Sequence, residues 1–483
     1  MCLYGTLALA PALASVLIWF SNRRRNPKGL PYPPGPQGYP LIGNLLDMPR
    51  EYQHEAFSAW SAKYGDMVYV EVLQRPILIL NSLPRIQDLL EKRSTKYSDR
   101  PAATMFKELM GWKDMMTTMD YGPRLRLQRK VFSQFFTREA VQKYRPLHLE
   151  RIQRLVSRLA ERNDDSVLAF VHDHMSATIA RLVYSIDIEE DRVYTGMIDG
   201  IVKAFEEAAI PGRFLVDALP FLKHIPNWFP GAGFKRFGAN ATKLLKQLQE
   251  HPFRLVEEKM SQGMAEACIA SELIEKLPPT SDPTRQEMTA LFRQVTAIAH
   301  IGVCGVWSVI VMKTFLYAMS THQSIQRKAQ EEIDREVDMG RLPNFDDRQR
   351  LPYVNAVVKE SMRWITVGPF AFPHALAHDD EYDGYFIPKG TVVLPNTWAI
   401  QHDPTLYTNP FEYNPDRFLD HNSEAPDPAI TAFGYGRRIC PGSHFALDAI
   451  YIFVVSILAT FDVLPQSEEA LRNEIKLVDG PLG

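Results

Sequence analysis

One short stretch near the C-terminus holds a single cysteine in a loop. Residues 433–442 read Phe-Gly-Tyr-Gly-Arg-Arg-Ile-Cys-Pro-Gly, and the cysteine is Cys440. Three glycines and a proline interrupt any helix or strand, and glycine permits the close backbone approach that a bound group requires. An apolar stretch begins near Pro441, so the thiol is expected at a helix N-terminus, where Arg437 and Arg438 would also favour the thiolate. Such a thiolate can ligate iron.

This stretch resembles the haem-binding signature of the cytochrome P450 superfamily. The match rests on five positions at the family's spacing, which are Phe433, Gly436, Arg438, Cys440 and Gly442. The resemblance implies a mainly α-helical fold with small β-sheets, and a haem b group with Cys440 as the axial iron ligand, a thiolate that favours O–O cleavage. It also implies that Arg438 pairs with a haem propionate. Taken alone, a buried cysteine is more often an inert small hydrophobe.

Two further positions resemble haem contacts of the family. Arg129, in the basic stretch 124–130, matches an arginine that holds a propionate, although Leu125 replaces the tryptophan that precedes it in the family. His374 resembles a position whose side chain also reaches a propionate. The alternatives are a solvated charged face for the basic stretch and a satisfied core histidine for His374.

A second group of residues is expected to be structural. Glu360 and Arg363 are three residues apart, so they share one face of a predicted helix. On its own this is a surface pair that contributes little. Arg417 and then Cys440 follow in the family's order. The resemblance therefore implies a buried network of Glu360, Arg363 and Arg417 that holds the cysteine loop.

The helix expected to cross the haem, at residues 285–319, departs from the family's pattern. Family members carry an acid followed by a threonine there, and this pair delivers protons during oxygen activation. The ungapped match at 328–332 places Val306 and Trp307 at the two positions. Neither side chain can relay a proton, and losing a positioned proton donor typically costs on the order of 10²–10⁴ in rate. The Trp307 indole also adds bulk over the expected iron position, where it can stack on a flat substrate or simply pack in the core.

Three hypotheses account for this departure. First, His300 lies two helical turns before Trp307, with Thr296 and Cys304 near the same face, so another group can donate the proton. A packed, non-catalytic histidine is the alternative. Second, a hydroxyl group of the substrate can supply the proton path. Third, the haem can catalyse an isomerisation, dehydration, desaturation or peroxide-dependent oxidation that needs no delivered protons.

The elements that must position these residues are mostly helical by their hydrophobic pattern. A hairpin is predicted from strands at 67–72 and 77–80, and a second hairpin from 385–390 and 391–394. Helices are predicted in the following ranges: 51–64, 84–92, 145–186, 193–209 and 235–259.

Two other stretches are candidates for the walls of a substrate pocket. A methionine-rich stretch ends at Met119, and methionine packs adaptably, although ordinary loop packing explains it equally well. The apolar, proline-rich stretch 211–234 resembles the segment between the F and G helices of fungal secondary-metabolism P450s. There it roofs the substrate channel and dips toward the membrane.

Length and composition restrict the remaining possibilities. The 483 residues exceed the single-core limit of about 250–300, but the resemblance favours one large domain. A hydrophobic content of 46% and a net charge of −3 indicate a globular protein without a nucleic-acid footprint. The four cysteines lie far apart, so neither a disulfide framework nor a zinc site is predicted.

The N-terminal region predicts a membrane anchor. Residues 3–20 are uncharged and mostly apolar, and three arginines follow at 23–25, which places the C-terminal side in the cytosol. A cleaved signal peptide would carry its positive charge before the apolar core. We expect a transmembrane anchor at 1–21, a basic and proline-rich linker at 22–40 and a haem-thiolate catalytic domain at 41–483. The location implied is the endoplasmic reticulum membrane, with a single pass and contact with membrane lipid.

The resemblance as a whole implies a monooxygenase that inserts one oxygen atom into a lipophilic small molecule. Because the chain contains no flavin or dinucleotide fingerprint, electrons would come from a separate NADPH-cytochrome reductase. The fungal character of 211–234 suggests a terpenoid or polyketide natural product. The alternatives are a haem-thiolate enzyme that does not activate oxygen and a non-catalytic haem-binding membrane protein.

Overall fold

The computed structural model describes residues 26–161, 167–187, 192–210, 212–303, 306–419 and 425–465. The predicted anchor at 1–21 and Cys304 lie outside these residues. Two helices are long and apolar enough to cross a membrane, at Arg285–Thr321 and Ser443–Thr460, but 71% and 72% of their apolar windows are buried inside the protein. Such burial is typical of core helices.

Helices make up most of the described chain, as predicted. The α-helices are α2 (Gln53–Tyr64), α3 (Leu83–Ile86), α4 (Pro123–Phe136), α5 (Arg145–Glu161), α6 (Val167–Tyr184), α7 (Arg192–Ala209), α8 (Leu215–Ala218), α9 (Gly233–Ser261), α10 (Ile269–Glu275), α11 (Arg285–Val303), α12 (Val306–Thr321), α13 (Gln323–Glu336), α14 (Pro352–Arg363), α15 (Thr397–Gln401), α16 (Ala429–Ala432) and α17 (Ser443–Thr460). Shorter turns of helix include η1 (Gln87–Lys92), η2 (Thr104–Leu109), η7 (Pro415–Phe418) and η8 (Gly436–Arg438). The helix predicted at 285–319 corresponds to α11 and α12.

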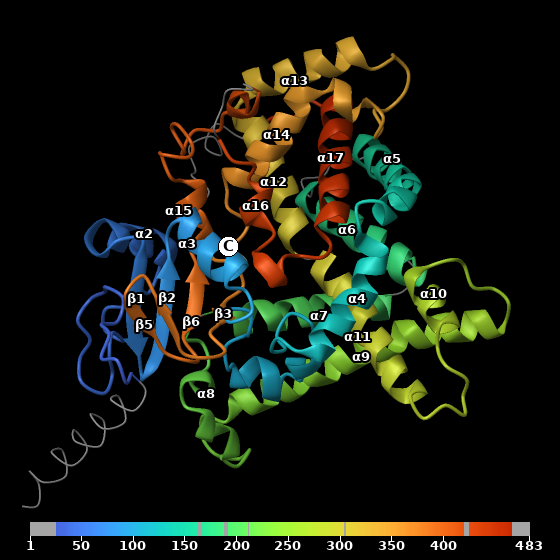
Figure 1. The fold of residues 1–483 in the computed structure, drawn as a ribbon. Helices are drawn as coiled ribbons and strands as arrows, with labels where there is room; N and C mark the ends of the chain where they lie inside the picture. Colours follow the sequence, from blue (N-terminus) through green and yellow to red (C-terminus); the bar gives the residue numbers. More distant parts are fainter. Residues whose placement is uncertain are drawn as a thin grey trace, which may run out of the picture.

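The strands form two small sheets. Four of them, β1 (Met67–Val72), β2 (Arg75–Leu80), β3 (His374–Ala375) and β6 (Val392–Pro395), pair in the order β1-β2-β6-β3. In Figure 1 the strands gather at one side of the molecule, and the helices, with α12 and α17 at their centre, fill the rest. The predicted β1–β2 hairpin is confirmed.

The second predicted hairpin was wrong. Strand β5 (Tyr385–Ile387) pairs with β4 (Asp380–Tyr382), whereas β6 pairs with β2 and β3. Asp383 and Gly384 make the tight turn between β4 and β5, with φ angles of 52° and 78°. An Asp-Gly pair between short strands is a strong hairpin signal because both residues tolerate positive φ. This local turn determines the pairing of β5.

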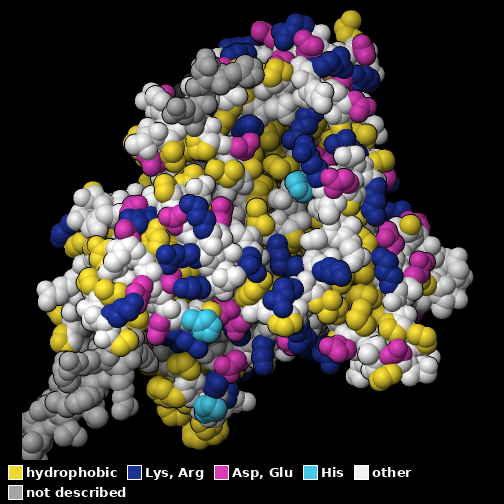
Figure 2. Space-filling view, viewed as in Figure 1, with side chains coloured by type: hydrophobic (Ala, Val, Ile, Leu, Met, Phe, Trp, Pro, Cys, Tyr) yellow, Lys and Arg dark blue, Asp and Glu magenta, His cyan; other side chains and the backbone are white. Residues whose placement is uncertain are grey.

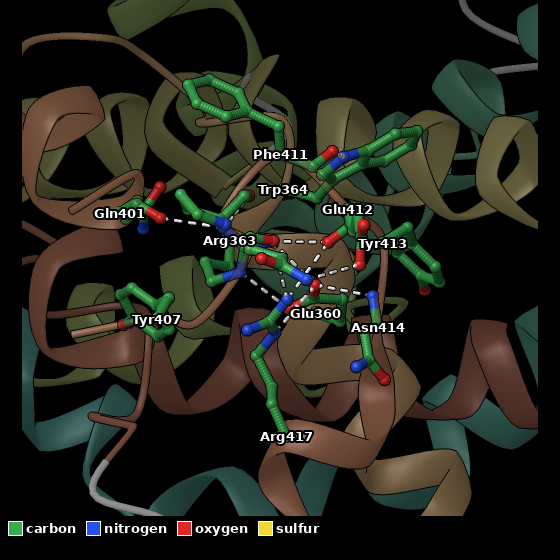
Figure 3. A network of polar contacts seen from close by, with 12 residues as sticks. Glu360, Arg363, Trp364, Gln401, Tyr407, Phe411, Glu412, Tyr413, Asn414 and Arg417 are labelled. Atoms are coloured by element: carbon green, nitrogen blue, oxygen red, sulfur yellow. Dashed lines mark hydrogen bonds and ion pairs between the residues drawn. The ribbon is translucent and has the colours of Figure 1, made fainter. Parts of the chain in front are cut away.

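A buried ion network on α14 holds the segment that leads to the cysteine loop (Figure 3). Glu360 and Arg363 are both 0% exposed, and the Arg363 guanidinium donates to both carboxylate oxygens of Glu360 at 2.8 Å. Arg417 Nε donates to Glu360 Oε1 at 3.2 Å. The three residues predicted to form a buried network therefore do so.

The network reaches the cysteine loop through an intermediate segment. Arg363 Nη1 donates to the backbone carbonyls of Gln401, at 2.8 Å, and Pro410, at 2.7 Å. The side chain of Gln401 then donates to Thr431 Oγ1 at 3.0 Å, and Thr431 lies in α16, directly before Phe433. These buried hydrogen bonds connect α14 to the start of the cysteine loop and fix the position of one relative to the other.

Replacing Glu360 with glutamine should strongly destabilise the protein. The change leaves Arg363 and Arg417 buried without their carboxylate, and breaking a buried pair costs about 3–5 kcal/mol. We expect a large fall in the urea midpoint, measured by circular dichroism. The control is Lys246→Gln, which removes an exposed pair with Glu250 and should cost under about 1 kcal/mol. Equal losses in the two variants would contradict a supporting role for the network.

Candidate active site

A cavity lies where the cysteine loop faces α4, α11, α12 and the segments before α4 and after α14. Cys440 and Phe433 line it from the loop, and Trp307 lines it from α12. Arginine, threonine and serine side chains also line it, while the rest of the wall is largely apolar. The structure thus brings together residues that are far apart in the sequence.

The cysteine loop is shaped by its own backbone and by η1. The Cys440 N–H donates to the Phe433 carbonyl at 2.7 Å, which closes the loop. Gly436 has a φ of +53°, and a Cβ there would lie 1.9 Å from the carbonyl oxygen of Leu90 on η1. Gly436 is not on the cavity wall. Its role is to let the loop pack against η1.

The electrostatic surroundings of Cys440 differ in part from the prediction. Burial raises the pKa of the Cys440 thiol, and a hydrogen bond from the Gly442 N–H and the charge of Arg129 oppose this. Arg437 points elsewhere, because its guanidinium donates to Ser94 Oγ at 3.1 Å and to the Tyr121 hydroxyl. Of the nearby arginines, Arg129 rather than Arg437 or Arg438 therefore lowers the pKa of the Cys440 thiol, and burial outweighs it.

Three arginines line the cavity: Arg100, Arg129 and Arg438. Arg438 donates to three backbone carbonyls, those of Ser98 at 2.7 Å, Met116 at 3.2 Å and Met119 at 2.6 Å. Arg129 Nη2 donates to the Ile439 carbonyl at 2.9 Å. Arg100 donates to carbonyls of Thr117, Phe372 and Pro373, at 2.7–2.9 Å. Backbone dipoles thus orient all three guanidinium groups.

The charges of these arginines are poorly balanced. Burial, followed by the charge of Arg129, lowers the pKa of Arg438 to about 10, and Asp99 and Asp120 offset this only in part. The pKa of Arg100 is lowered well below its usual range by burial and by the other two arginines. Among the described residues that line the cavity there is no aspartate or glutamate. The cavity is therefore suited to a bound group that carries negative charge.

Arg100 was not identified from the sequence as a site residue. It follows Ser98 and Asp99 and precedes Pro101, and an arginine in such a polar turn is normally exposed. The Arg100 side chain is only 9% exposed because its guanidinium donates hydrogen bonds to carbonyls of segments far away in the sequence. No local pattern signals that arrangement.

His374 lies beside the arginines but not on the cavity wall. It is 2% exposed, and its Nδ1 is 2.7 Å from the Tyr97 carbonyl. Burial and then the charge of Arg100 lower the pKa of His374 well below its usual value, which keeps the imidazole neutral. The contact of His374 with a bound group remains a prediction.

The helices over the cavity place the predicted residues differently from expectation. Trp307 and Ser308 of α12 line the cavity, as does Gly302 of α11, but His300 does not. His300 Nδ1 lies 2.6 Å from the hydroxyl of Tyr194 on α7, and burial lowers the pKa of His300 to about 3. Because His300 is directed at Tyr194 and does not line the cavity, the geometry does not support His300 as a proton donor.

Comparison with known proteins identifies the family. The model of the cytochrome P450 family matches residues 33–479. This chain belongs to the cytochrome P450 family. Its relatives include cytochrome P450 monooxygenase COX2 of Coprinopsis cinerea, 40% identical over 96% of this chain and 90% of the relative. Cytochrome P450 monooxygenase 208 of Postia placenta is 38% identical over 94% of this chain and 88% of the relative. Tryptamine 4-monooxygenase of Psilocybe cyanescens is 36% identical over 92% of this chain and 89% of the relative.

The cavity of this P450 monooxygenase fits the haem-thiolate cofactor that the family implies. A haem carries two propionates, and the three arginines on the wall lack carboxylate partners there. Among the described residues, the same wall carries one cysteine, Cys440, and cysteine is the residue type that ligates iron in P450s. The donor set and the charge of the cavity therefore match the group.

Replacing Gly436 with alanine should disrupt the cysteine loop of this P450. The new Cβ would meet a backbone oxygen on η1, and the positive φ adds about 1–2 kcal/mol of strain. We expect lower haem content per protein and a lower thermal midpoint. Gly384→Ala is the matched control, since Gly384 has a φ of +78° but open space around its Cβ position. Gly384→Ala should lower the thermal midpoint through the strain of its positive φ, and its haem content should stay normal. Normal haem content in Gly436→Ala would contradict the packing role of Gly436.

Proposed function

We propose that this P450 binds haem b through Cys440 and oxidises a lipophilic natural product of the terpenoid or polyketide type. Bound haem supplies the activation of dioxygen, with electrons from NADPH delivered by a membrane-bound NADPH-cytochrome reductase. One oxygen atom enters the substrate, and the other leaves as water. The observation that carries the proposal is the cavity in which Cys440, three arginines and an apolar wall meet.

Each group on the wall has a distinct role in this proposal. Cys440 holds the iron, and Arg100, Arg129 and Arg438 bind the propionates, with His374 beside them. The apolar wall includes Phe132, Val367, Phe370 and Phe372. These side chains exclude water and favour an apolar substrate.

An exposed apolar patch supports association with a membrane. We call it the α8 patch, and it consists of Leu215, Leu219, Phe221, Trp228 and Phe229. Trp228 is 80% exposed and Phe221 is 65% exposed. Figure 2 shows hydrophobic side chains gathered at the lower edge of the molecule, in the region that Figure 1 labels α8. Together with the apolar residues 3–20, the patch supports a cytosolic domain that rests on the endoplasmic reticulum membrane.

Oxygen-isotope incorporation tests the reaction. The full chain is expressed with a reductase and supplied with terpenoid and aromatic polyketide scaffolds under labelled dioxygen. We expect one labelled oxygen atom in the product, detected by mass spectrometry. The control is Cys440→Ala, which should lose both the product and the red-shifted Soret band of the thiolate-ligated carbon monoxide complex. A modified product without label would contradict oxygen insertion, and an unchanged spectrum in Cys440→Ala would contradict the ligand assignment.

Fluorescence quenching tests the membrane contact. Brominated lipids quench only those tryptophans that enter the bilayer, and the α8 patch presents Trp228 to it. We expect the quenched amplitude of the full chain in brominated vesicles to fall in Trp228→Phe. Trp60→Phe is the control, since Trp60 packs on Phe57 in α2, away from the patch, and should leave the amplitude unchanged. An identical amplitude in Trp228→Phe would show that the patch stays in water.

A further inference from the structure

A second exposed apolar surface lies near the N-terminal end of the described chain. We call it the Leu41 loop, and it covers residues 39–46. Leu41 is 70% exposed, Leu46 is 71% exposed and Tyr39 is 55% exposed. Residues 29–46 contain no charged side chain. An exposed apolar surface without charges is typical of a contact with a membrane or with another protein.

Hydrogen bonds hold the Leu41 loop in a fixed shape. Tyr39 and Gly43 exchange two backbone hydrogen bonds at 2.8 Å, and the Asn44 N–H donates to the Glu71 carbonyl of β1 at 2.6 Å. The Asn44 side chain accepts a hydrogen bond from the Glu71 N–H at 3.0 Å. A Cβ on Gly43 would lie 1.9 Å from the Glu71 carbonyl oxygen, so the loop packs closely on β1. The backbone of the loop thus covers an edge strand of the sheet, a role that does not require exposed leucines.

The backbone of Leu41 adopts a conformation that favours glycine. Its φ is +69°, in the turn that follows Pro40. A residue with a Cβ is strained in this region, and such strain is found mostly at functional positions. Because the Leu41 side chain is mostly exposed, packing within the protein does little to offset the strain. The leucine at this position therefore indicates a partner outside the chain.

The Leu41 loop lies at the same end of the molecule as the α8 patch. The Leu73 N–H, in the turn between β1 and β2, donates to the Ile42 carbonyl of the loop at 3.2 Å. Burial raises the pKa of Asp217 on α8, and the charge of Arg75, two residues after Leu73, opposes this. The turn that contacts the loop therefore lies close to α8. Figure 1 shows the dark blue N-terminal segment and α8 at the lower left, whereas α13 lies at the opposite end.

We propose that the Leu41 loop is a second contact of this protein with the lipid bilayer. Leu41 and Leu46 enter the apolar region of the bilayer, and Tyr39 lies at its interface, where tyrosine is enriched. The proposal rests on the membrane association proposed above. A bilayer fits this surface better than a protein does, because only five residues, about 18 Å of extended chain, separate Asn26 from the end of the apolar segment 3–20.

The second contact has a consequence for the orientation of the domain. A single contact at the α8 patch restrains the distance of the domain from the bilayer but leaves its tilt free. Two rigid contacts on different elements, one on β1 and one at α8, also restrain the tilt. The same face of the catalytic domain would then always be turned toward the lipid.

Tryptophan quenching by brominated lipids measures the second contact in the full chain. Leu46→Trp adds one fluorophore to the loop, and we expect it to raise the quenched amplitude by as much as Trp228→Phe lowers it. The same increase is expected when the two changes are combined. Met339→Trp is the matched control, because Met339 is 99% exposed and follows α13 at the opposite end of the molecule. It should add fluorescence that the brominated lipid does not quench.

Leu41→Asp tests the apolar side chain itself. Aspartate tolerates a positive φ better than leucine does, so the thermal midpoint of the full chain in detergent should not fall. A carboxylate cannot enter the apolar region without a large cost, so quenching of the tryptophan introduced by Leu46→Trp should fall to the level of Met339→Trp. A lower midpoint with unchanged quenching would assign Leu41 a structural role and overturn its contact with lipid.

The outcomes separate this inference from the membrane association on which it rests. Quenching of Trp228 without quenching in Leu46→Trp would overturn the second contact and leave the α8 patch in place. Quenching at neither position would overturn both, and quenching in Leu46→Trp alone would support the Leu41 loop and contradict the α8 patch. A blue shift of the Leu46→Trp fluorescence that grows with protein concentration, without vesicles, would overturn the bilayer in favour of a second copy of the chain.

Discussion

Three arginines without carboxylate partners on the cavity wall, two of them buried and one partly buried, impose the strongest constraint on this structure. A guanidinium taken out of water needs either an opposite charge or a complete set of acceptors. Here backbone carbonyls from segments far apart in the chain supply part of that set for Arg100, Arg129 and Arg438. The segments before α4, after α14 and before α17 must therefore meet at one cavity. A dianionic cofactor would complete the balance, so folding and cofactor binding depend on the same groups.

In the network on α14, by contrast, the buried arginines have a carboxylate partner within the protein. Glu360 is buried between Arg363 and Arg417, and carbonyl groups of the segment 401–412 take up the remaining donors. This network is satisfied within the protein, so it can act as a fixed support. The arginines of the cavity are left for a ligand. The residues of the α14 network therefore hold the cysteine loop, whereas the arginines of the cavity are available to bind the cofactor.

The parts of the site that were predictable from the sequence are those within one short segment. Cys440 and Phe433 belong to a single loop, whose glycines and proline restrict its backbone, and the helical fold class was implied by the family resemblance of that loop. Arg100 was missed because its partners come from distant segments. The pairing of β5 was wrong because the Asp383–Gly384 turn signal was overlooked. His300 was misplaced because its side chain contacts Tyr194 on α7, a partner far away in the sequence.

The helices over the cavity combine two departures from the family's pattern that have one physical consequence. At the positions where an acid and a threonine would carry protons, α12 begins with Val306 and Trp307. His300, the nearest titratable group on α11 by sequence, faces Tyr194 and is held neutral by burial. The wall therefore presents an aromatic surface and a serine hydroxyl, neither of which is an acid near neutral pH. Among the described residues of α11 and α12 that line the cavity there is thus no acid, so a proton path for oxygen activation would need water, the substrate or a group on another part of the wall.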